Sequence, residues 1–227
     1  MNQTQLAAFG AYCDLLIERS LRVNLTAIKD ERGIVIKHFV DSLCAAAYVP
    51  ELADAVRAGG GSERVRLIDI GAGAGFPGIP LKILLGDELS VTMLDSVGKK
   101  INFMNEVTGL LGLADCEAIH IRAEDASRRD DLHRRFSFAT ARALAPLPKI
   151  IEYCLPFLQP GGLLIAMKGR RETTEAELES SGTLIKNSYC KILRVTSYKL
   201  ETADYFDAGY GSADYYDRTL VIIKREK

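Results

Sequence analysis

The first sixty residues show the apolar spacing of amphipathic helices. Between residues 2 and 21, apolar side chains recur every three or four positions, at Leu6, Phe9, Cys13, Leu16 and Ile17. The same period predicts helices over residues 31–49 and 51–58. The run Ala-Gly-Gly-Gly-Ser at 58–62 then breaks the pattern, because consecutive glycines favour a flexible joint. We therefore predict a helical N-terminal extension over residues 1–60.

After the joint, short apolar runs alternate with helical patterns. The predicted strands cover residues 64–70, 90–95, 117–122, 136–141, 162–167, 189–198 and 218–224. The predicted helices cover residues 78–85, 98–111, 146–158 and 172–182. This alternation is typical of a parallel sheet wound by helices. We predict that residues 61–227 form one doubly wound, Rossmann-like α/β domain with a seven-stranded, mostly parallel sheet.

The end of the chain departs from this alternation. No helical pattern separates the last two predicted strands, and residues 202–217 are loop-like and rich in glycine, aspartate and tyrosine. Strands that are joined without a crossover pair in the antiparallel sense. We therefore expect the sheet to end in an antiparallel hairpin.

Composition narrows the classes of protein that fit this pattern. Of the 227 residues, 48% are hydrophobic and 26% are charged, which suits a globular chain with one good core. The net charge of −1 gives no general attraction to polyanions, so contact with nucleic acid would need a local basic face. We see no signal-peptide pattern and no apolar run of about 18 residues, the length of a membrane span. A monomeric cytoplasmic protein that does not enter a membrane is expected.

The five cysteines are scattered along the chain, and none belongs to a C-x-x-C pair. An odd, unpatterned set argues against both a disulfide framework and a zinc site. We therefore expect no metal, and we expect each cysteine to pack in the core. They are Cys13, Cys44, Cys116, Cys154 and Cys190.

A glycine-rich turn directly follows the first predicted strand, in the sequence LIDIGAGAGFPGIP of residues 67–80. A dinucleotide-binding turn would read G-x-G-x-x-G, but here the third glycine comes one residue early and Phe76 stands in the last glycine's place. The two prolines after Phe76 also remove backbone donors that a pyrophosphate would use at a helix N-terminus. A dinucleotide is therefore disfavoured, and a P-loop is excluded because no Gly-Lys-Ser/Thr follows.

S-adenosylmethionine fits this turn better, because it has no phosphate and still needs close approach to the backbone. Asp69, just before the turn, could neutralise its ammonium group directly or through water. Asp95 ends the next strand, where a carboxylate can accept hydrogen bonds from both ribose hydroxyls. Glu124 follows the third strand, where an adenine edge would lie. Ligands of open α/β sheets bind outside the carboxyl ends of the strands, and these positions agree. The structural alternative is a tight turn with solvated carboxylates.

Several segments, in order along the chain, resemble one family. They are Asn24-Leu25-Thr26, HFVDSL at 38–43, DIGAGAGFPGIPL at 69–81, Leu94-Asp95-Ser96 with Lys99-Lys100, Arg122-Ala123-Glu124, Ala141-Arg142-Ala143 and Lys168-Gly169. With these motifs the chain resembles the bacterial small-subunit ribosomal RNA guanine-N7 methyltransferases, called RsmG or GidB. The resemblance implies a class I methyltransferase that transfers a methyl group from S-adenosylmethionine to N7 of one guanine, guanine 527, in 16S ribosomal RNA.

The resemblance also implies roles for single residues. It implies cofactor contacts by Gly71, Phe76, Ala123, Glu124 and Arg142, and the turn and strand end add Gly73 and Asp95. Arg142 could donate a forked pair of hydrogen bonds to guanine O6 and N7, or it could form a structural salt bridge with a carboxylate. Lys168 faces the same rim, where it could contact phosphate or base, or end a strand in solvent. Arg142 and Lys168 are the predicted catalytic residues.

The proposed chemistry needs little proton transfer. Guanine N7 keeps an in-plane lone pair at neutral pH, so the task is to align this nitrogen with the methyl group. The chain lacks the Pro-Pro segment that is usual in methyltransferases of amino nitrogens. None of its cysteines follows a proline, as the nucleophile of carbon-5 pyrimidine enzymes usually does.

Other polar residues have two interpretations each. A basic run could join further cations around the pocket and bind phosphate, although a solvated loop explains it equally well. The run is Arg128, Arg129, His133, Arg134 and Arg135, and the further cations are Lys99, Lys100, Arg170 and Arg171. His38 is expected to be a packed helix residue rather than an active-site residue. The resemblance suggests that it borders the substrate cleft with Asn24, Asp41 and Ser42.

Three other functions remain open at this point. The balanced net charge also permits a methyltransferase that acts on a small molecule or a protein. A dinucleotide oxidoreductase is opposed by the early third glycine and by Phe76. A catalytically silent RNA-binding module is opposed by the presence of Gly71, Asp95 and Arg142.

Overall fold

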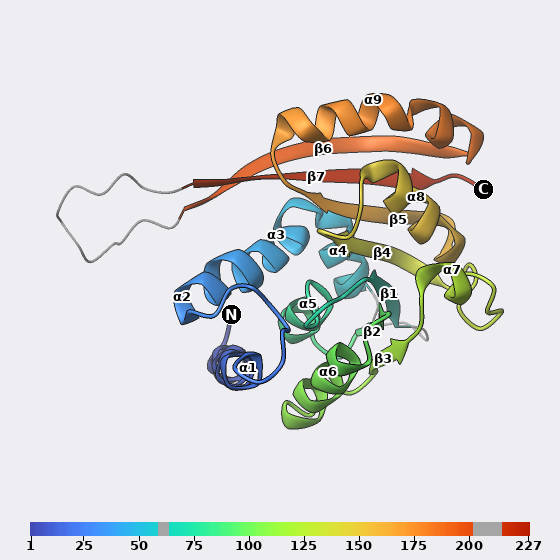
Figure 1. Ribbon diagram of the computed structural model, residues 1–227. Helices are drawn as coiled ribbons and strands as arrows, with labels where there is room; N and C mark the ends of the chain where they lie inside the picture. The colour runs from blue at the N-terminus through green and yellow to red at the C-terminus, as the bar shows by residue number, and fades with distance from the viewer. Residues whose placement is uncertain (59–63, 202–214) are drawn as a thin grey trace.

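The computed structural model describes residues 1–58, 64–201 and 215–227. Most of the predicted joint at 58–62 and of the predicted loop at 202–217 lies outside the described residues. A seven-stranded sheet forms the centre of the described part (Figure 1). Its strands are β1 (Val65–Ile70), β2 (Leu89–Asp95), β3 (Cys116–His120), β4 (Phe136–Arg142), β5 (Leu158–Lys168), β6 (Cys190–Glu201) and β7 (Tyr215–Arg225).

The strand order is β3-β2-β1-β4-β5-β7-β6. β1 to β5 pair in parallel, and β7 lies antiparallel between β5 and β6. The predicted mostly parallel sheet with a final antiparallel hairpin is therefore confirmed. β7 begins at Tyr215, three residues earlier than predicted, because Tyr215 and Tyr216 pair with Glu201 and Leu200. Tyrosine suits a pleated, half-buried surface, so this tyrosine pair extends the strand.

Nine α-helices lie in the described residues, including the short α7, which the apolar pattern did not predict. They are α1 (Gln3–Ser20), α2 (Glu31–Ile34), α3 (Asp41–Tyr48), α4 (Pro50–Ala58), α5 (Gly78–Leu85), α6 (Gly98–Leu110), α7 (Ala123–Ala126), α8 (Leu147–Cys154) and α9 (Arg171–Asn187). The predicted helix at 31–49 is continuous but contains a π-helical segment, η1 (Val35–Val40), between α2 and α3. The predicted helix at 146–158 is shorter, because it passes into a 3-10 turn, η2 (Leu155–Phe157), around Pro156.

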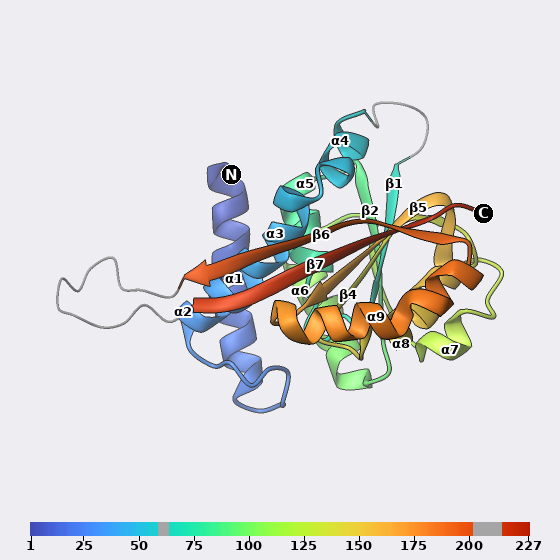
Figure 2. The same ribbon diagram turned by 90° about the horizontal axis from the view of Figure 1, so that it is seen from above.

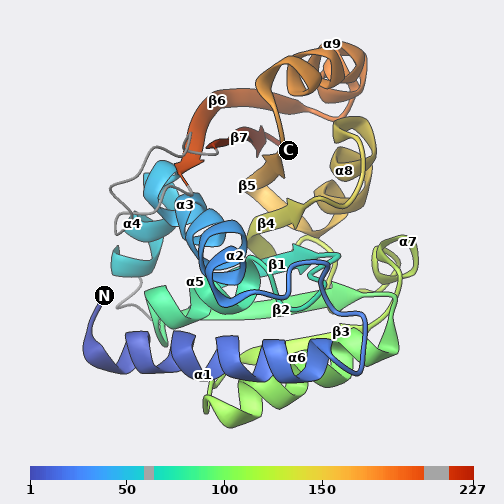
Figure 3. The ribbon, with the colours of Figure 1, turned by 60° about the vertical axis from the view of Figure 1, so that its left-hand side comes forward.

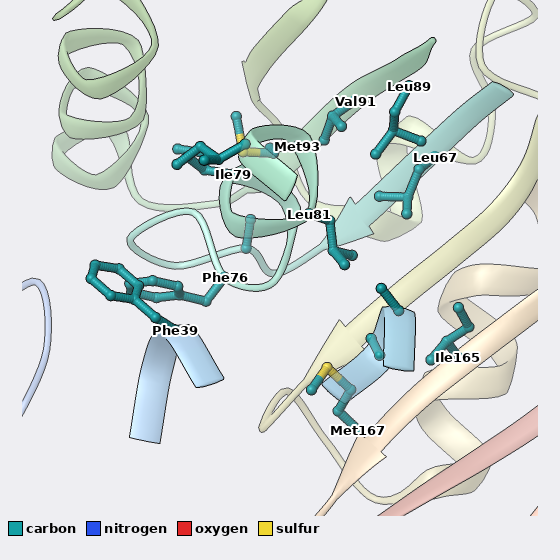
Figure 4. Packing of buried hydrophobic residues seen from close by; sticks show 14 of the residues in the cluster. Phe39, Leu67, Phe76, Ile79, Leu81, Leu89, Val91, Met93, Ile165 and Met167 are labelled. Atoms are coloured by element: carbon teal, nitrogen blue, oxygen red, sulfur yellow. The ribbon is translucent and has the colours of Figure 1, made fainter. Parts of the chain in front are cut away.

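Side chains alternate between the two faces of the sheet, so each strand contributes to two hydrophobic clusters. Leu67 of β1 packs with α1, α5 and α6 on one face, whereas Ile68 packs with α8 and α9 on the other (Figure 3). The first cluster also contains Phe39 of η1 and Phe76 of the turn after β1 (Figure 4). The N-terminal helices therefore share a hydrophobic cluster with the sheet.

The hairpin of β6 and β7 extends beyond the carboxyl ends of the parallel strands (Figures 1 and 2). Pairing between β5 and β7 ends at Lys168 and Thr219, but pairing between β6 and β7 continues to Glu201 and Tyr215. Four residues of β7 therefore project past the end of β5. They stand at the sheet edge where ligands of this architecture bind.

Candidate active site

The turn between β1 and α5 is tied to β2. The backbone N–H of Gly71 donates to the carbonyl of Leu94 over 2.8 Å, and that of Gly73 donates to Asp95 Oδ2 over 2.9 Å. Gly71 and Gly73 have φ of +70° and +63°, values that side chains rarely adopt. A Cβ on Gly71 would lie 2.5 Å from Leu144, but a Cβ on Gly73 would meet nothing closer than a carbonyl oxygen at 4.0 Å. Gly73 therefore faces open space.

Two adjacent cavities occupy this edge of the sheet, and Gly71, Lys100 and Ala143 line both. The first, which we call the Asp95 cavity, has a volume of about 500 Å³ and lies over the ends of β2 and β3. The second, the Arg142 cavity, has a volume of about 440 Å³ and lies between the turn, η1, β4 and β7. The two cavities meet where the chain leaves β1.

The Asp95 cavity brings together Asp95, Ala123 and Glu124, as the sequence predicted. Asp95 Oδ1 accepts a hydrogen bond from the N–H of Val97 over 2.9 Å. The hydroxyl of Tyr153 donates to Glu124 Oε1 over 2.8 Å. A hydrogen bond from its own backbone N–H and this bond from Tyr153 lower the pKa of Glu124. Glu124 is therefore charged at neutral pH and can accept further hydrogen bonds in this cavity.

Asp69 does not have the predicted role of a direct partner for an ammonium group. Its carboxylate is fully buried and lines neither cavity. It accepts hydrogen bonds from the N–H of Gly78 over 2.9 Å and from the hydroxyl of Thr140 over 3.0 Å. Burial raises its pKa from 3.8 to about 7. Asp69 therefore holds the start of α5 against β4, beneath the turn.

Phe76 forms a wall of the Arg142 cavity and is held by two other rings. Tyr12 of α1 stacks on it with ring centroids 5.4 Å apart, and His38 of η1 stacks at 4.5 Å. The buried hydroxyl of Tyr12 donates to the carbonyl of Ala74 in the turn. Sequence reasoning missed Tyr12. Its signal was a tyrosine on the apolar face of an amphipathic helix, where the hydroxyl needs a buried acceptor.

Arg142, at the end of β4, is an internal partner of the N-terminal helices. Its Nη1 donates to the carbonyl of Lys37 over 3.0 Å and to Asp41 Oδ2 over 3.1 Å. Its Nη2 lies 3.1 Å from His38 Nδ1, and its guanidinium carbon is 5.0 Å from the Phe76 ring centroid. The predicted alternative of a salt bridge to a carboxylate is therefore present. Arg142 still lines the cavity, with 13% of its side chain exposed.

The protonation state of His38 follows from its partners. A guanidinium has only donors, so His38 Nδ1 must accept from Arg142, and Nε2 must carry the proton. Nε2 then donates to the Thr26 hydroxyl over 2.7 Å. Burial, with a further contribution from Arg142, lowers the pKa of His38 from 6.5 to about 3. His38 is thus a neutral, packed residue, as predicted, and it also lines the Arg142 cavity.

Asp41 joins three distant parts of the chain. It lies at the start of α3 and is only 2% exposed. Besides Arg142, it accepts hydrogen bonds from the hydroxyl of Tyr198 over 2.8 Å and from Nε of Arg218 over 3.2 Å. Sequence reasoning missed Tyr198 and Arg218, which come from β6 and β7. Their strand pairing brings them here, and no local pattern predicts it.

Lys168 lies at the end of β5 and lines the Arg142 cavity. Its ammonium group is 2.7 Å from Glu177 Oε2 on α9 and donates to the carbonyl of Ala145 over 2.9 Å. Only 11% of the side chain is exposed. The alternative of a solvated strand end is therefore wrong. Contact with phosphate or base stays a prediction.

The predicted grouping of the basic run around the pocket is wrong for its last two arginines. Arg134 and Arg135 directly precede β4, so they lie at the amino edge of the sheet, opposite the two cavities. With Arg64 and Arg66 they line a separate cavity of about 520 Å³. Arg129 forms an ion pair with Asp131 on the surface. Among the other cations expected there, Lys100 does reach both cavities.

The cysteines pack as predicted. Cys13, Cys154 and Cys190 are buried, and Cys44 and Cys116 are half-buried. Burial raises the pKa of all five thiols, so none is a thiolate at neutral pH. In the part of the chain that the structure describes, no three His, Cys, Asp or Glu side chains are placed to hold a metal ion. No described helix is long and apolar enough to cross a membrane.

Solved structures with a similar fold are methyltransferases. An O-methyltransferase from Bacillus cereus in complex with SAH has a TM-score of 0.60 and 16% identity, over 94% of this chain and 90% of that one. A precorrin-6y C5,15-methyltransferase from Geobacter metallireducens has a TM-score of 0.56 and 13% identity, over 78% of this chain and 88% of that one. The fold is therefore that of the class I S-adenosylmethionine-dependent methyltransferases.

Sequence comparison is more specific. A family model described as rRNA small subunit methyltransferase G matches residues 5–202. A protein named ribosomal RNA small subunit methyltransferase G from Acetivibrio thermocellus is 39% identical over 90% of this chain and 78% of its own length. One of the same name from Lactobacillus johnsonii is 36% identical over 100% of this chain and 86% of its own. The chain belongs to this family, which confirms the resemblance carried by its motifs.

Proposed function

We propose that this protein transfers a methyl group from S-adenosylmethionine to N7 of guanine 527 in 16S ribosomal RNA of the small subunit. The observation that carries the proposal is the meeting of the Asp95 and Arg142 cavities at Gly71. One cavity offers carboxylates to an adenosine, and the next has room for a base beside it.

The residues present fit S-adenosylmethionine. The space above Gly73, which a Cβ would enter, gives the ligand close access to the turn. Asp95 and Glu124 accept hydrogen bonds in the Asp95 cavity, as the ribose and adenine require. Ala123 lines the same cavity with a small side chain. When bound, the cofactor would supply a methyl group on a positively charged sulfur.

The Arg142 cavity suits a nucleophile that needs no deprotonation. Both nitrogens of His38 are engaged, and its pKa of about 3 keeps the ring neutral. Asp41 is buried and already accepts from three donors. Neither group is placed to act as a general base, and guanine N7 requires none. These residues therefore position the base, and proximity supplies the rate enhancement.

Arg142 cannot donate hydrogen bonds to both O6 and N7 of guanine during methyl transfer. The N7 lone pair must attack the methyl group, so no side chain can donate a hydrogen bond to N7 during transfer. Guanine O6 remains available as an acceptor. Because Nη1 and Nη2 of Arg142 already hold Lys37, Asp41 and His38, we infer that Arg142 shapes the cavity and fixes Phe76 beside the cofactor.

The names of the relatives support ribosomal RNA as the substrate class. Cations on the cavity wall agree with a polyanionic substrate, although the whole chain has a net charge of −1. The monomeric state and the cytoplasmic location stay predictions.

The test is site-specific mapping of 7-methylguanine. Small-subunit RNA from cells that lack this protein is incubated with it and S-adenosylmethionine, and the RNA is cleaved chemically at 7-methylguanine. We expect one new cleavage at guanine 527. Methyl transfer to protein or to metabolites, with none to this RNA, would overturn the proposal.

A pair of variants separates the role of Arg142 from general damage. Arg142→Lys keeps the charge opposite Asp41 but loses the planar fork of donors. We expect it to reduce methylation at least about 100-fold, the loss that can follow a misplacement of about 1 Å. Arg171→Lys makes the same change at an exposed arginine that pairs with Glu175, and it should retain full activity. Equal activity of the two variants would contradict the role of Arg142.

A further inference from the structure

Two cations on the wall of the Arg142 cavity come from opposite ends of the chain. Lys37 belongs to η1 in the N-terminal part of the chain, and Arg218 belongs to β7 in the C-terminal hairpin. The two residues are far apart in the sequence. The fold nevertheless brings both to one cavity.

Tyr216 holds the two cations at this place. The Lys37 ammonium donates to the Tyr216 hydroxyl and lies 4.0 Å from the ring centroid. The guanidinium carbon of Arg218 is 5.9 Å from the same centroid. Tyr216 belongs to the part of β7 that projects beyond Lys168, so the cations stand at the mouth of the cavity. The interaction of a cation with an aromatic face restrains a long side chain without using up all its donors.

Both cations keep donors that the protein does not use. Arg218 donates from Nε to Asp41 and from Nη1 to the carbonyl of Asp217, over 3.2 Å in each case. Within residues 1–58, 64–201 and 215–227, its Nη2 has no hydrogen-bond acceptor. The Lys37 ammonium has three protons, and among the described residues it has one acceptor, the Tyr216 hydroxyl. Each cation can therefore donate to a ligand at the cavity mouth.

The charge around the cavity identifies the chemistry of that ligand. Five cationic side chains and one carboxylate, Asp41, line it; the cations are Lys37, Lys100, Arg142, Lys168 and Arg218. Methyl transfer moves a positive charge from sulfur to the base, so the cations cannot serve to attract the product base. Carboxylates of the protein already pair with Lys100, Arg142 and Lys168. The positive charge of Lys37 and of the free edge of Arg218 is left for an anion that accompanies the base. In RNA, that anion is the phosphodiester on either side of the nucleotide.

We propose that Lys37 and Arg218 form a phosphate-binding subsite for the RNA backbone next to the methylated guanosine. The subsite rests on the proposed function, because it needs RNA to be the substrate. Lys37 contributes a point charge, and Arg218 contributes a planar donor edge. The subsite exists only when η1 and the β6–β7 hairpin are docked together. Backbone contact of this kind positions the substrate without reading its sequence.

The test compares RNA binding by two double variants that remove the same charge. Lys37→Ala with Arg218→Ala removes the subsite, whereas Arg134→Ala with Arg135→Ala removes two cations at the opposite edge of the sheet. Affinity for a 16S RNA transcript is measured by filter binding between about 50 and 200 mM salt. We expect the first variant to lose at least about tenfold in affinity, with a shallower salt dependence by about 1 in the log–log slope. The control should keep the wild-type slope.

Further measurements separate loss of the subsite from loss of structure. Lys37→Ala alone leaves Asp41 and all its partners in place, so it tests the subsite even if the double variant unfolds. Arg218→Lys restores a charge and should recover part of the affinity. Calorimetry should show unchanged affinity for S-adenosylmethionine in every variant that folds.

The outcomes are distinct from those of the proposed function. Unchanged RNA affinity and slope in the Lys37 and Arg218 variants, with normal methylation by the wild type, would overturn the subsite alone. Weaker binding with an unchanged slope would also overturn it, because no phosphate contact would then have been lost. RNA binding that depends on Lys37 and Arg218, without formation of 7-methylguanine, would overturn the proposed function; the two residues would then contact RNA with no methylated guanosine beside them.

Discussion

Replacement of Asp41 by alanine is the sharpest test of how the site is held together. The carboxylate is 2% exposed and accepts from Arg142, Tyr198 and Arg218. In Asp41→Ala, the guanidinium of Arg142 loses its ion-pair partner, although its side chain is only 13% exposed. The hydroxyl of Tyr198 loses its buried acceptor as well. Both effects act in the folded state, because water solvates these groups in the unfolded chain.

The size of the effect follows from burial. Removal of one partner of a buried ion pair costs about 3–5 kcal/mol, because the remaining charge is left uncompensated. Arg218 is 24% exposed, so water can replace part of its interaction, and we give it little weight. We therefore expect Asp41→Ala to lower the free energy of unfolding by about 4 kcal/mol. For a chain of this length, this corresponds to a decrease in Tm of about 8–16 °C.

Urea unfolding, followed by circular dichroism, measures the change in the free energy of unfolding. Asp125→Ala is the matched control, because Asp125 pairs with Arg128 over 3.6 Å with 59% of its side chain exposed. Such a surface pair contributes less than about 1 kcal/mol. Asp41→Asn keeps an acceptor for Tyr198 and should lie between the two. A loss below about 1 kcal/mol in Asp41→Ala would refute the argument that Asp41 is the buried junction of the site.

Three further predictions concern single positions. Burial raises the pKa of Asp69 from 3.8 to about 7. The protonated carboxyl therefore stabilises the fold fully below pH 3.8, and this stability is lost as the pH rises through about 7. Asp69→Asn should therefore unfold at a higher urea concentration than the wild type at about pH 8, with a smaller difference at about pH 5. A difference between the two proteins that does not change with pH would contradict the raised pKa of the buried carboxylate. Burial lowers the pKa of His38 from 6.5 to about 3. The neutral ring therefore stabilises the fold fully above pH 6.5, and this stability is lost as the pH falls from 6.5 through about 3. His38→Gln should lose less stability than the wild type as the pH falls below 6.5, in the same urea assay. An equal loss in the variant and the wild type would count against the neutral ring. Gly73→Val should reduce the affinity for S-adenosylmethionine at least about tenfold by calorimetry. Gly112→Val controls for backbone strain, because Gly112 has a similar φ of +61° and a Cβ added there would meet nothing within 4 Å. Equal affinities of the two variants for S-adenosylmethionine would place the ligand away from Gly73.

The lining of the Asp95 cavity could be predicted from the sequence because it follows from strand ends. In a parallel sheet, every residue directly after a strand lies at the same edge. This rule placed Gly71, Asp95 and Glu124 together, and they line one cavity. The same rule, applied to the residues before a strand, places Arg134 and Arg135 at the opposite edge. The interpretation that groups the basic run with the pocket is therefore wrong for Arg134 and Arg135, whereas a solvated loop was the equal alternative.

The Arg142 cavity could be predicted only in part, because its contacts join distant segments. The motif HFVDSL indicated that His38 and Asp41 border a cleft, but no local pattern shows that Asp41 meets Tyr198 and Arg218. These contacts depend on the register between β6 and β7. The alternation of apolar residues excludes a slip by one residue but not by two, because a two-residue slip keeps every side chain on its face. Glu177 likewise reaches Lys168 from α9, a contact that depends on how the helix packs.

The N-terminal extension is part of the site, although its predicted boundary lies near residue 60. His38 and Asp41 both line the Arg142 cavity, and Phe76 is stacked between His38 and Tyr12 within the hydrophobic cluster that the extension shares with the sheet. Arg142 at the end of β4 has hydrogen-bond partners only on η1 and α3 among the described residues. Without the extension, its guanidinium would therefore be free to move, and one wall of the cavity would be missing. The Arg142 cavity is therefore complete only when the N-terminal helices are docked against the sheet.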